Sequence, residues 1–118
     1  FAAVNGGMND NIRPALYQAK YHAVIASKMN EEPNTDTKIV GKSCESGDVL
    51  IEQIMLPNPK RGDILAIFST GAYNYSMASN YNRIPVPGMV LVKDGKIKWV
   101  VKAQTLKDII RNDVVPKS

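Results

Sequence analysis

A single cysteine lies in a short, glycine-flanked loop that can support acid–base or nucleophilic chemistry. Cys44 is the only cysteine in 118 residues, and the carboxylates of Glu45 and Asp48 follow it closely. A thiol in such a loop can transfer a proton or attack a substrate, and Gly41 and Gly47 allow a ligand to approach the backbone. The alternative interpretation is a small buried hydrophobic residue. The two carboxylates can hold the loop in place or bind a cation.

An arginine and a tyrosine four residues apart form a second candidate site. Arg13 and Tyr17 fall in a short predicted helix and share one face of it. We expect Asn9 or Asp10 to cap this helix. The guanidinium group of an arginine can donate two parallel hydrogen bonds to a carboxylate, so Arg13 and Tyr17 together can bind an anionic ligand. The alternative is an exposed arginine whose stem packs on a tyrosine ring.

Four segments, taken together and in order, resemble the C-terminal region of diaminopimelate decarboxylases, which depend on pyridoxal phosphate. The resemblance covers most of the chain from residue 4 to about residue 90. The adjacent cysteine and glutamate favour diaminopimelate over the related ornithine and arginine decarboxylases, which typically carry Cys-Asp. The matching segments are Val4–Asp10, Arg13–Tyr17, Cys44–Asp48 and Gly71–Asn82.

The resemblance implies a role for each matching side chain. Cys44 is implied to be the proton donor in the decarboxylation, and Glu45 to bind an ammonium group of the substrate. Arg13 and Tyr17 match substrate-binding residues, while Tyr73 matches a tyrosine that touches both the substrate and the cofactor phosphate. The cysteine loop is implied to reach the active site of the partner subunit in a homodimer. The implied reaction converts meso-2,6-diaminopimelate to L-lysine and carbon dioxide.

The family also has an N-terminal β/α barrel, whose lysine binds pyridoxal 5'-phosphate covalently. Such a barrel needs roughly 250 residues, and this chain shows no strand–helix alternation on that scale. We therefore expect residues 1–118 to form a single C-terminal β domain of a larger enzyme, inactive alone and without the cofactor lysine. Two alternatives stay open: another decarboxylase of the same fold, of the ornithine or arginine type, and a free-standing, non-catalytic β domain that binds a partner or ligand.

Composition and charge narrow the remaining classes of function. The net charge is +4, but the basic residues are scattered and no aromatic platform accompanies them, which argues against a nucleic-acid partner. A lone thiol excludes an internal disulfide and favours the reducing cytoplasm. No apolar run approaches the roughly 20 residues that span a bilayer. The single histidine has no neighbouring ligand residues, so no metal site is expected.

Turn residues recur about every 8 to 12 positions, which is typical of a β-sandwich or barrel. The predicted fold is mostly β, a Greek-key sandwich or barrel with short helices. The apolar strand at 63–68 is expected to be central. Asp94-Gly95 predicts a two-residue hairpin turn, and Thr105 is expected to cap a final helix. Strands are predicted at 1–4, 21–27, 38–40, 49–56, 63–68, 89–93 and 96–101.

Overall fold

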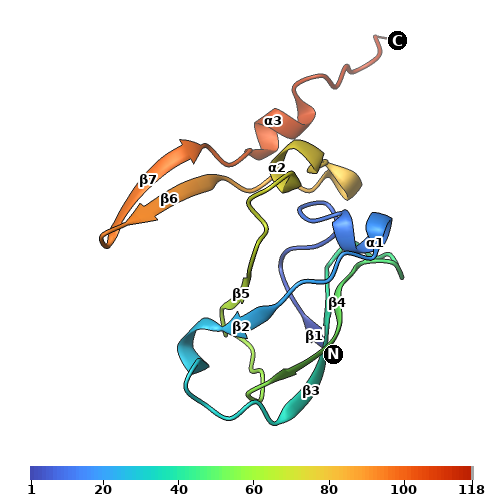
Figure 1. Ribbon diagram of the computed structural model, residues 1–118. Helices are drawn as coiled ribbons and strands as arrows, with labels where there is room; N and C mark the ends of the chain where they lie inside the picture. Colours follow the sequence, from blue (N-terminus) through green and yellow to red (C-terminus); the bar gives the residue numbers. More distant parts are fainter. Residues whose placement is uncertain (118) are drawn as a thin grey trace. The chain divides into compact units, whose positions relative to one another are not determined.

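The computed structural model describes residues 1–117, which fall into two compact units. The first unit is Phe1–Ala78, and the second begins at Ser79 (Figure 1). Both consist of short strands and short helices, so the predicted mostly β class is confirmed. Within the described residues no sheet closes into a barrel. In this part of the chain, no helix has the length and apolar character needed to cross a membrane.

Two small sheets make up the first unit. β1 (Ala2–Ala3) pairs parallel with β3 (Thr35–Val40), which pairs antiparallel with β4 (Val49–Leu56). β2 (Ala23–Ile25) and β5 (Leu65–Ile67) form a separate antiparallel pair. The predicted bounds of β4 are confirmed, whereas β3 begins at Thr35 rather than at residue 38.

The hydrophobic core joins these two sheets. Residues on β3 alternate between inward and outward directions, as the pleat of a strand requires, and this directs Ile39 into the core with none of its surface exposed. Full burial of such a side chain contributes about 1.5–3 kcal/mol to stability. The buried apolar residues of the core are Ala23, Ile25, Ile39, Leu50, Ile51 and Leu56.

β5 corrects one prediction, because it is neither long nor central. It pairs only with β2, and its three residues are half-buried. Its neighbours Ile64 and Phe68 are 71% and 45% exposed. A continuous apolar run is typical of a strand buried on both faces, but here the run includes residues that lie at the surface. Ser69 then adopts a left-handed backbone with φ +59°, which ends the extended segment.

The entry to the first helix corrects a second prediction. The N-cap residue of α1 (Arg13–Tyr17) is Ile12, which makes no side-chain cap hydrogen bond. Asn9 and Asp10 do not cap the helix. Their turn is instead closed by the backbone N–H of Asp10, which donates to the Gly7 carbonyl at 3.0 Å. The Asn9 amide donates to the Asp10 carboxylate at 2.8 Å.

The second unit is built around a hairpin that confirms its predicted bounds. β6 (Met89–Lys93) and β7 (Lys96–Val101) pair antiparallel around Asp94 and Gly95. Both turn residues have positive φ, +50° and +71°, which suits the twist of a two-residue hairpin.

Short helical segments complete both units, and the last of them has the predicted cap. The Thr105 side chain and the Asp108 carboxylate satisfy each other's backbone N–H groups in a capping box. Within residues 1–117 these segments are α1, η1 (Ala26–Lys28), α2 (Asn74–Met77), η2 (Tyr81–Arg83) and α3 (Leu106–Ile110).

Much of the apolar surface of the hairpin is exposed. Trp99 lies against Gly88, where an added Cβ would approach ring atom Cζ3 to 2.7 Å, yet 64% of its surface is exposed. We call the exposed apolar side chains of β6 and β7 the hairpin apolar surface. Its members more than half exposed are Leu91, Val92, Ile97, Trp99 and Val100.

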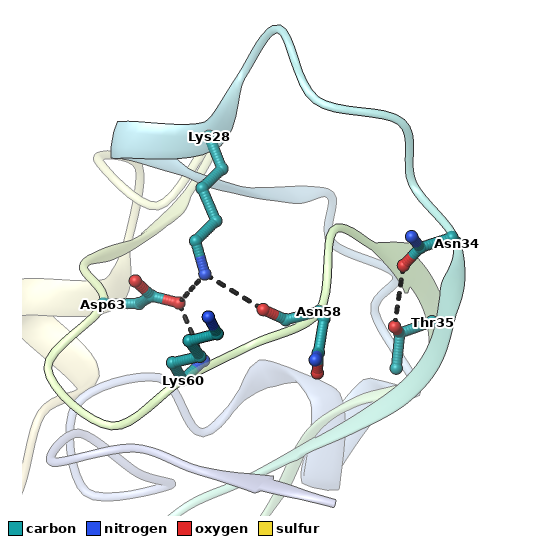
Figure 2. Close-up of polar contacts among 6 residues, drawn as sticks. All are labelled: Lys28, Asn34, Thr35, Asn58, Lys60 and Asp63. Atoms are coloured by element: carbon teal, nitrogen blue, oxygen red, sulfur yellow. Dashed lines mark hydrogen bonds and ion pairs between the residues drawn. The ribbon is translucent and has the colours of Figure 1, made fainter.

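An ion pair joins the end of η1 to the turn that precedes β5 in the first unit (Figure 2). Lys28 Nζ lies 2.6 Å from Asp63 Oδ2 and donates to the Asn58 carbonyl at 2.9 Å. The Lys60 N–H donates to the same carboxylate oxygen at 2.8 Å. The hydrogen bond from Lys28, followed by that from Lys60, lowers the pKa of Asp63 below its ordinary value of 3.8.

We expect Asp63→Asn to lower the free energy of unfolding at pH 7, because neither bond then has a charged acceptor. A carboxyl group with a lowered pKa in the folded state stabilises above its unfolded value of 3.8, and this contribution is lost as the pH falls through the folded pKa. The difference from wild type should therefore shrink below about pH 4 in urea denaturation. Glu31→Gln, at an exposed site in the same unit, is the control. Equal stability of Asp63→Asn and wild type at pH 7 would contradict this account.

Candidate active site

The loop between β3 and β4, residues 41–48, carries the cysteine and is held by a buried carboxylate. We call it the cysteine loop. Asp48 is 3% exposed, and its Oδ2 accepts the Ser43 N–H at 2.8 Å. Its Oδ1 accepts the Met8 N–H at 2.7 Å, from a segment 40 residues away. The Gly41 N–H donates to the Asp48 backbone carbonyl at 2.9 Å and closes the loop. Of the two roles that the sequence allowed for Asp48, the geometry supports holding the loop.

Cys44 is exposed at the tip of this loop, so the interpretation as a buried hydrophobic residue is wrong. Its backbone has φ +52°, a conformation that is uncommon for a residue other than glycine. The surrounding hydrogen bonds maintain this conformation, which presents the thiol to solvent. The adjacent Glu45 is also exposed, and its Oε1 accepts the Gly47 N–H at 3.4 Å. A thiol and a carboxylate are thus available side by side on one loop.

Arg13 is fixed by two tyrosines. Its Nη1 donates to the Tyr21 hydroxyl at 3.1 Å, and its guanidinium carbon lies 5.4 Å from the centre of the Tyr73 ring. A cation over an aromatic face is attracted by the electrons of the ring. We call Arg13, Tyr21 and Tyr73 the arginine cluster. The fold therefore brings together Arg13 and Tyr73, two of the predicted site residues, from positions far apart in the sequence.

The backbone of Tyr73 is strained in a way that projects its ring outward. Its φ is +69°, and 68% of its surface is exposed. Its carbonyl accepts the Ser76 hydroxyl at 2.8 Å and the Met77 N–H at 3.0 Å, which ties the residue to the first turn of α2. Strained residues of this kind persist only where the surrounding structure enforces them, and they cluster at binding sites.

In the part of the chain that the structure describes, neither Tyr17 nor Cys44 forms a hydrogen bond or ring contact with the arginine cluster. Tyr17 shares α1 with Arg13, but its side chain is 61% exposed, and the guanidinium packs on Tyr73 instead. Within residues 1–117 no hydrogen bond, ion pair or ring contact joins Cys44 to Arg13. The predicted site residues therefore fall into two groups, Cys44 with Glu45 and Arg13 with Tyr73, although α1 and the cysteine loop line one cavity.

Sequence reasoning did not identify Tyr21 or Asn9. Tyr21 was placed in a strand, and only the reversal of the chain after α1, where Gln18 adopts φ +56°, returns its hydroxyl to Arg13. Asn9 was assigned as a cap but is 1% exposed. A Cβ on Gly7 would lie 3.1 Å from Asn9 Oδ1, so this amide packs closely beside the turn that precedes α1.

Burial is the largest influence on the pKa of Asp10, in the turn that precedes α1. Burial raises the pKa of the Asp10 carboxyl above its ordinary value of 3.8, against a hydrogen bond from the Gly7 backbone and the positive charge of Lys42. The nearby negative charge of Asp48 raises it further. Among the described residues there is no group of three or more histidine, cysteine or acidic side chains placed to hold a metal ion. In general a thiol can transfer a proton and a guanidinium can bind an anion.

Comparison with known proteins identifies the family. The family model described as pyridoxal-dependent decarboxylase, C-terminal sheet domain, matches residues 1–71. The chain is 57% identical over 114 residues to a diaminopimelate decarboxylase of Bacillus subtilis, covering 97% of this chain and 26% of that protein. It is 52% identical over 114 residues to the same enzyme of Staphylococcus aureus, covering 96% and 27%.

Solved structures give the same result. The crystal structure of diaminopimelate decarboxylase from M. jannaschii in complex with L-lysine aligns with a TM-score of 0.87 and 39% identity, covering 97% of this chain and 26% of that one. The Helicobacter pylori enzyme complexed with L-lysine aligns with a TM-score of 0.80 and 37% identity, covering 92% and 27%. The chain thus spans about a quarter of the length of the relatives it matches. It belongs to the pyridoxal-dependent decarboxylase family, as a C-terminal sheet domain.

Proposed function

We propose that this chain is the C-terminal domain, residues 1–118, of a diaminopimelate decarboxylase that converts meso-2,6-diaminopimelate to L-lysine and carbon dioxide. The observation that carries the proposal is 57% identity over nearly the whole chain to a relative of that name. The adjacent Cys44 and Glu45, exposed on one loop, add local support. The partner domain would be an N-terminal β/α barrel, and the location the cytoplasm.

Pyridoxal 5'-phosphate, bound by the complete enzyme, would supply the electron sink for the charge that decarboxylation leaves on Cα. In this proposal, Tyr73 is the residue of this chain that contacts the cofactor, at its phosphate. The exposed Tyr73 phenol can donate one hydrogen bond to a phosphate but cannot surround it alone. The main phosphate site and the lysine that binds the cofactor therefore belong to the barrel in this proposal.

Each of the two groups has a distinct task in this scheme. The Cys44 Sγ holds the proton that is delivered to Cα, and the Glu45 carboxylate pairs with a substrate ammonium group. Arg13 and Tyr17 bind a substrate carboxylate, and Tyr73 contacts the substrate beside the guanidinium. The exposure of Cys44 at the tip of its loop is consistent with a homodimer in which the cysteine loop completes the active site of the partner subunit.

The hairpin apolar surface favours a larger enzyme over a free-standing domain. Monomeric soluble proteins rarely leave a large contiguous apolar surface in water. On this hairpin Val92 lies opposite Ile97 in the register, and these two residues and Trp99 are each more than 60% exposed. Coverage by the rest of the enzyme explains this composition. A decarboxylase acting on ornithine or arginine remains the second candidate, and a panel of amino-acid substrates offered to the full-length enzyme decides between them.

We expect Cys44→Ala to lower kcat of the full-length enzyme by about 10²–10⁴-fold, the usual contribution of a general acid. The absorbance of bound pyridoxal phosphate should be unchanged, since the thiol does not hold the cofactor. Glu31→Gln, an exposed change elsewhere in the same unit, is the control. Turnover equal to wild type would remove Cys44 from the role of proton donor.

Arg13→Ala should chiefly weaken substrate binding, because a paired carboxylate loses its cation at a cost of about 2–5 kcal/mol. The KM for diaminopimelate is then expected to rise roughly 30-fold or more, as measured by steady-state kinetics. Arg61→Ala, in an exposed turn of the same unit, should leave KM unchanged. A wild-type KM in Arg13→Ala would mean that another group binds the substrate carboxylate.

Tyr21→Phe removes the hydroxyl that accepts a hydrogen bond from Arg13 and keeps the ring. Loss of a single hydrogen bond to a charged group costs about 1.5–3 kcal/mol, so KM should rise less than in Arg13→Ala. In the double variant the effect of Tyr21→Phe should vanish, because its partner is gone. Additive effects in this double-mutant cycle would show that Tyr21 acts independently of Arg13.

A further inference from the structure

The Asp48 carboxylate occupies a space that two glycines leave open. A Cβ on Gly7 would lie 2.7 Å from Asp48 Oδ2, and a Cβ on Gly41 would lie closer still. The side chain is thus enclosed on both sides while it accepts the N–H groups of Met8 and Ser43. A buried carboxylate that accepts backbone hydrogen bonds is a strong and directional anchor. Either glycine replaced by a larger residue would displace it.

Each of the two bonded segments leads directly to a group of the proposed active site. Ser43 immediately precedes Cys44, whose left-handed backbone depends on a fixed loop. Met8 lies in the turn closed on the Gly7 carbonyl, and that turn runs into α1 at Arg13. A shift of either N–H away from the carboxylate would therefore move the thiol or the guanidinium.

We propose that Asp48 is a positioning residue that fixes the cysteine loop and the segment leading to Arg13 to each other within one subunit. This inference rests on the proposed function, in which the thiol of one subunit serves the site of its partner and Arg13 serves the site of its own. One buried carboxylate then links the acid group of one active site to the anion-binding group of the other. Its loss affects both proton delivery and substrate binding.

The test compares Asp48→Asn with Asp63→Asn in the full-length enzyme. Asparagine has the shape of aspartate but keeps only one accepting oxygen, so it can accept from Met8 or from Ser43 but not from both at once. Each N–H is therefore unbonded for part of the time, and the two segments are no longer fixed to each other. Asp63 is a matched control because it also accepts a backbone N–H, from Lys60 at 2.8 Å, in a turn far along the chain from Cys44. Hydrogen exchange by mass spectrometry reports residues 5–12 and 41–48, and steady-state kinetics report kcat and KM.

For Asp48→Asn we expect faster exchange in both segments together, a fall in kcat of at least tenfold and a rise in KM. Asp63→Asn should speed exchange only near residues 58–63 and leave both kinetic constants unchanged. Faster exchange in only one of the two segments, or in both with unchanged kcat and KM, would overturn the proposal.

Gly7→Ala provides a second variant in case Asp48→Asn does not fold. It retains the carboxylate but presses a methyl group against Oδ2. We therefore expect faster exchange in both segments, a lower kcat and a higher KM, with smaller changes than in Asp48→Asn. Wild-type exchange and kinetics in a folded Gly7→Ala enzyme would count against the inference. The exchange result does not depend on the reaction. An inactive wild-type protein would therefore refute the proposed function, while paired exchange would still support the link made by Asp48.

Discussion

The antiparallel pairing of β3 with β4 is the constraint on which the first unit depends. Its register places Ile39 opposite Ile51 in the core and Val40 opposite Val49 at the end of the ladder. Because the ladder ends there, the intervening residues must close as a loop, and the hydrogen bonds of Asp48 determine its shape. Core packing and presentation of the thiol therefore both follow from the pairing of β3 with β4, whose register shifts between Ile39 and Val40.

The candidate site uses backbone conformations that side chains other than glycine seldom adopt. Cys44 and Tyr73, with φ of +52° and +69°, both project exposed side chains from such positions. Each conformation costs of order 1–3 kcal/mol, and this is offset by hydrogen bonds nearby. The backbone strain at Cys44 and Tyr73 therefore reduces the stability of the fold, and at both positions it accompanies the outward projection of a reactive or binding side chain.

How far the sequence predicts this structure depends on how local each interaction is. The hairpin turn at Asp94-Gly95 and the cap at Thr105 were predicted because neighbouring residues determine them. The bond between Met8 and Asp48 was not, since it joins segments 40 residues apart. β5 was misjudged because apolar composition does not reveal how many strands lie alongside. Residue type and spacing made Cys44 and Arg13 candidate site residues, but their particular roles came only from the family resemblance and stay predictions.

The distance in sequence between Met8 and Asp48 also bears on the order in which the chain folds. Closing the short loop between β3 and β4 costs little chain entropy, whereas docking the N-terminal segment requires a loop several times longer. Local pairing of this kind forms on a microsecond scale, so we expect the carboxylate to be in place before its distant N–H donor docks. During synthesis the order is reversed, because Met8 emerges first and has no acceptor until residue 48 has left the ribosome. The turn that contains Met8 therefore lacks this hydrogen bond until β3 and β4 have paired.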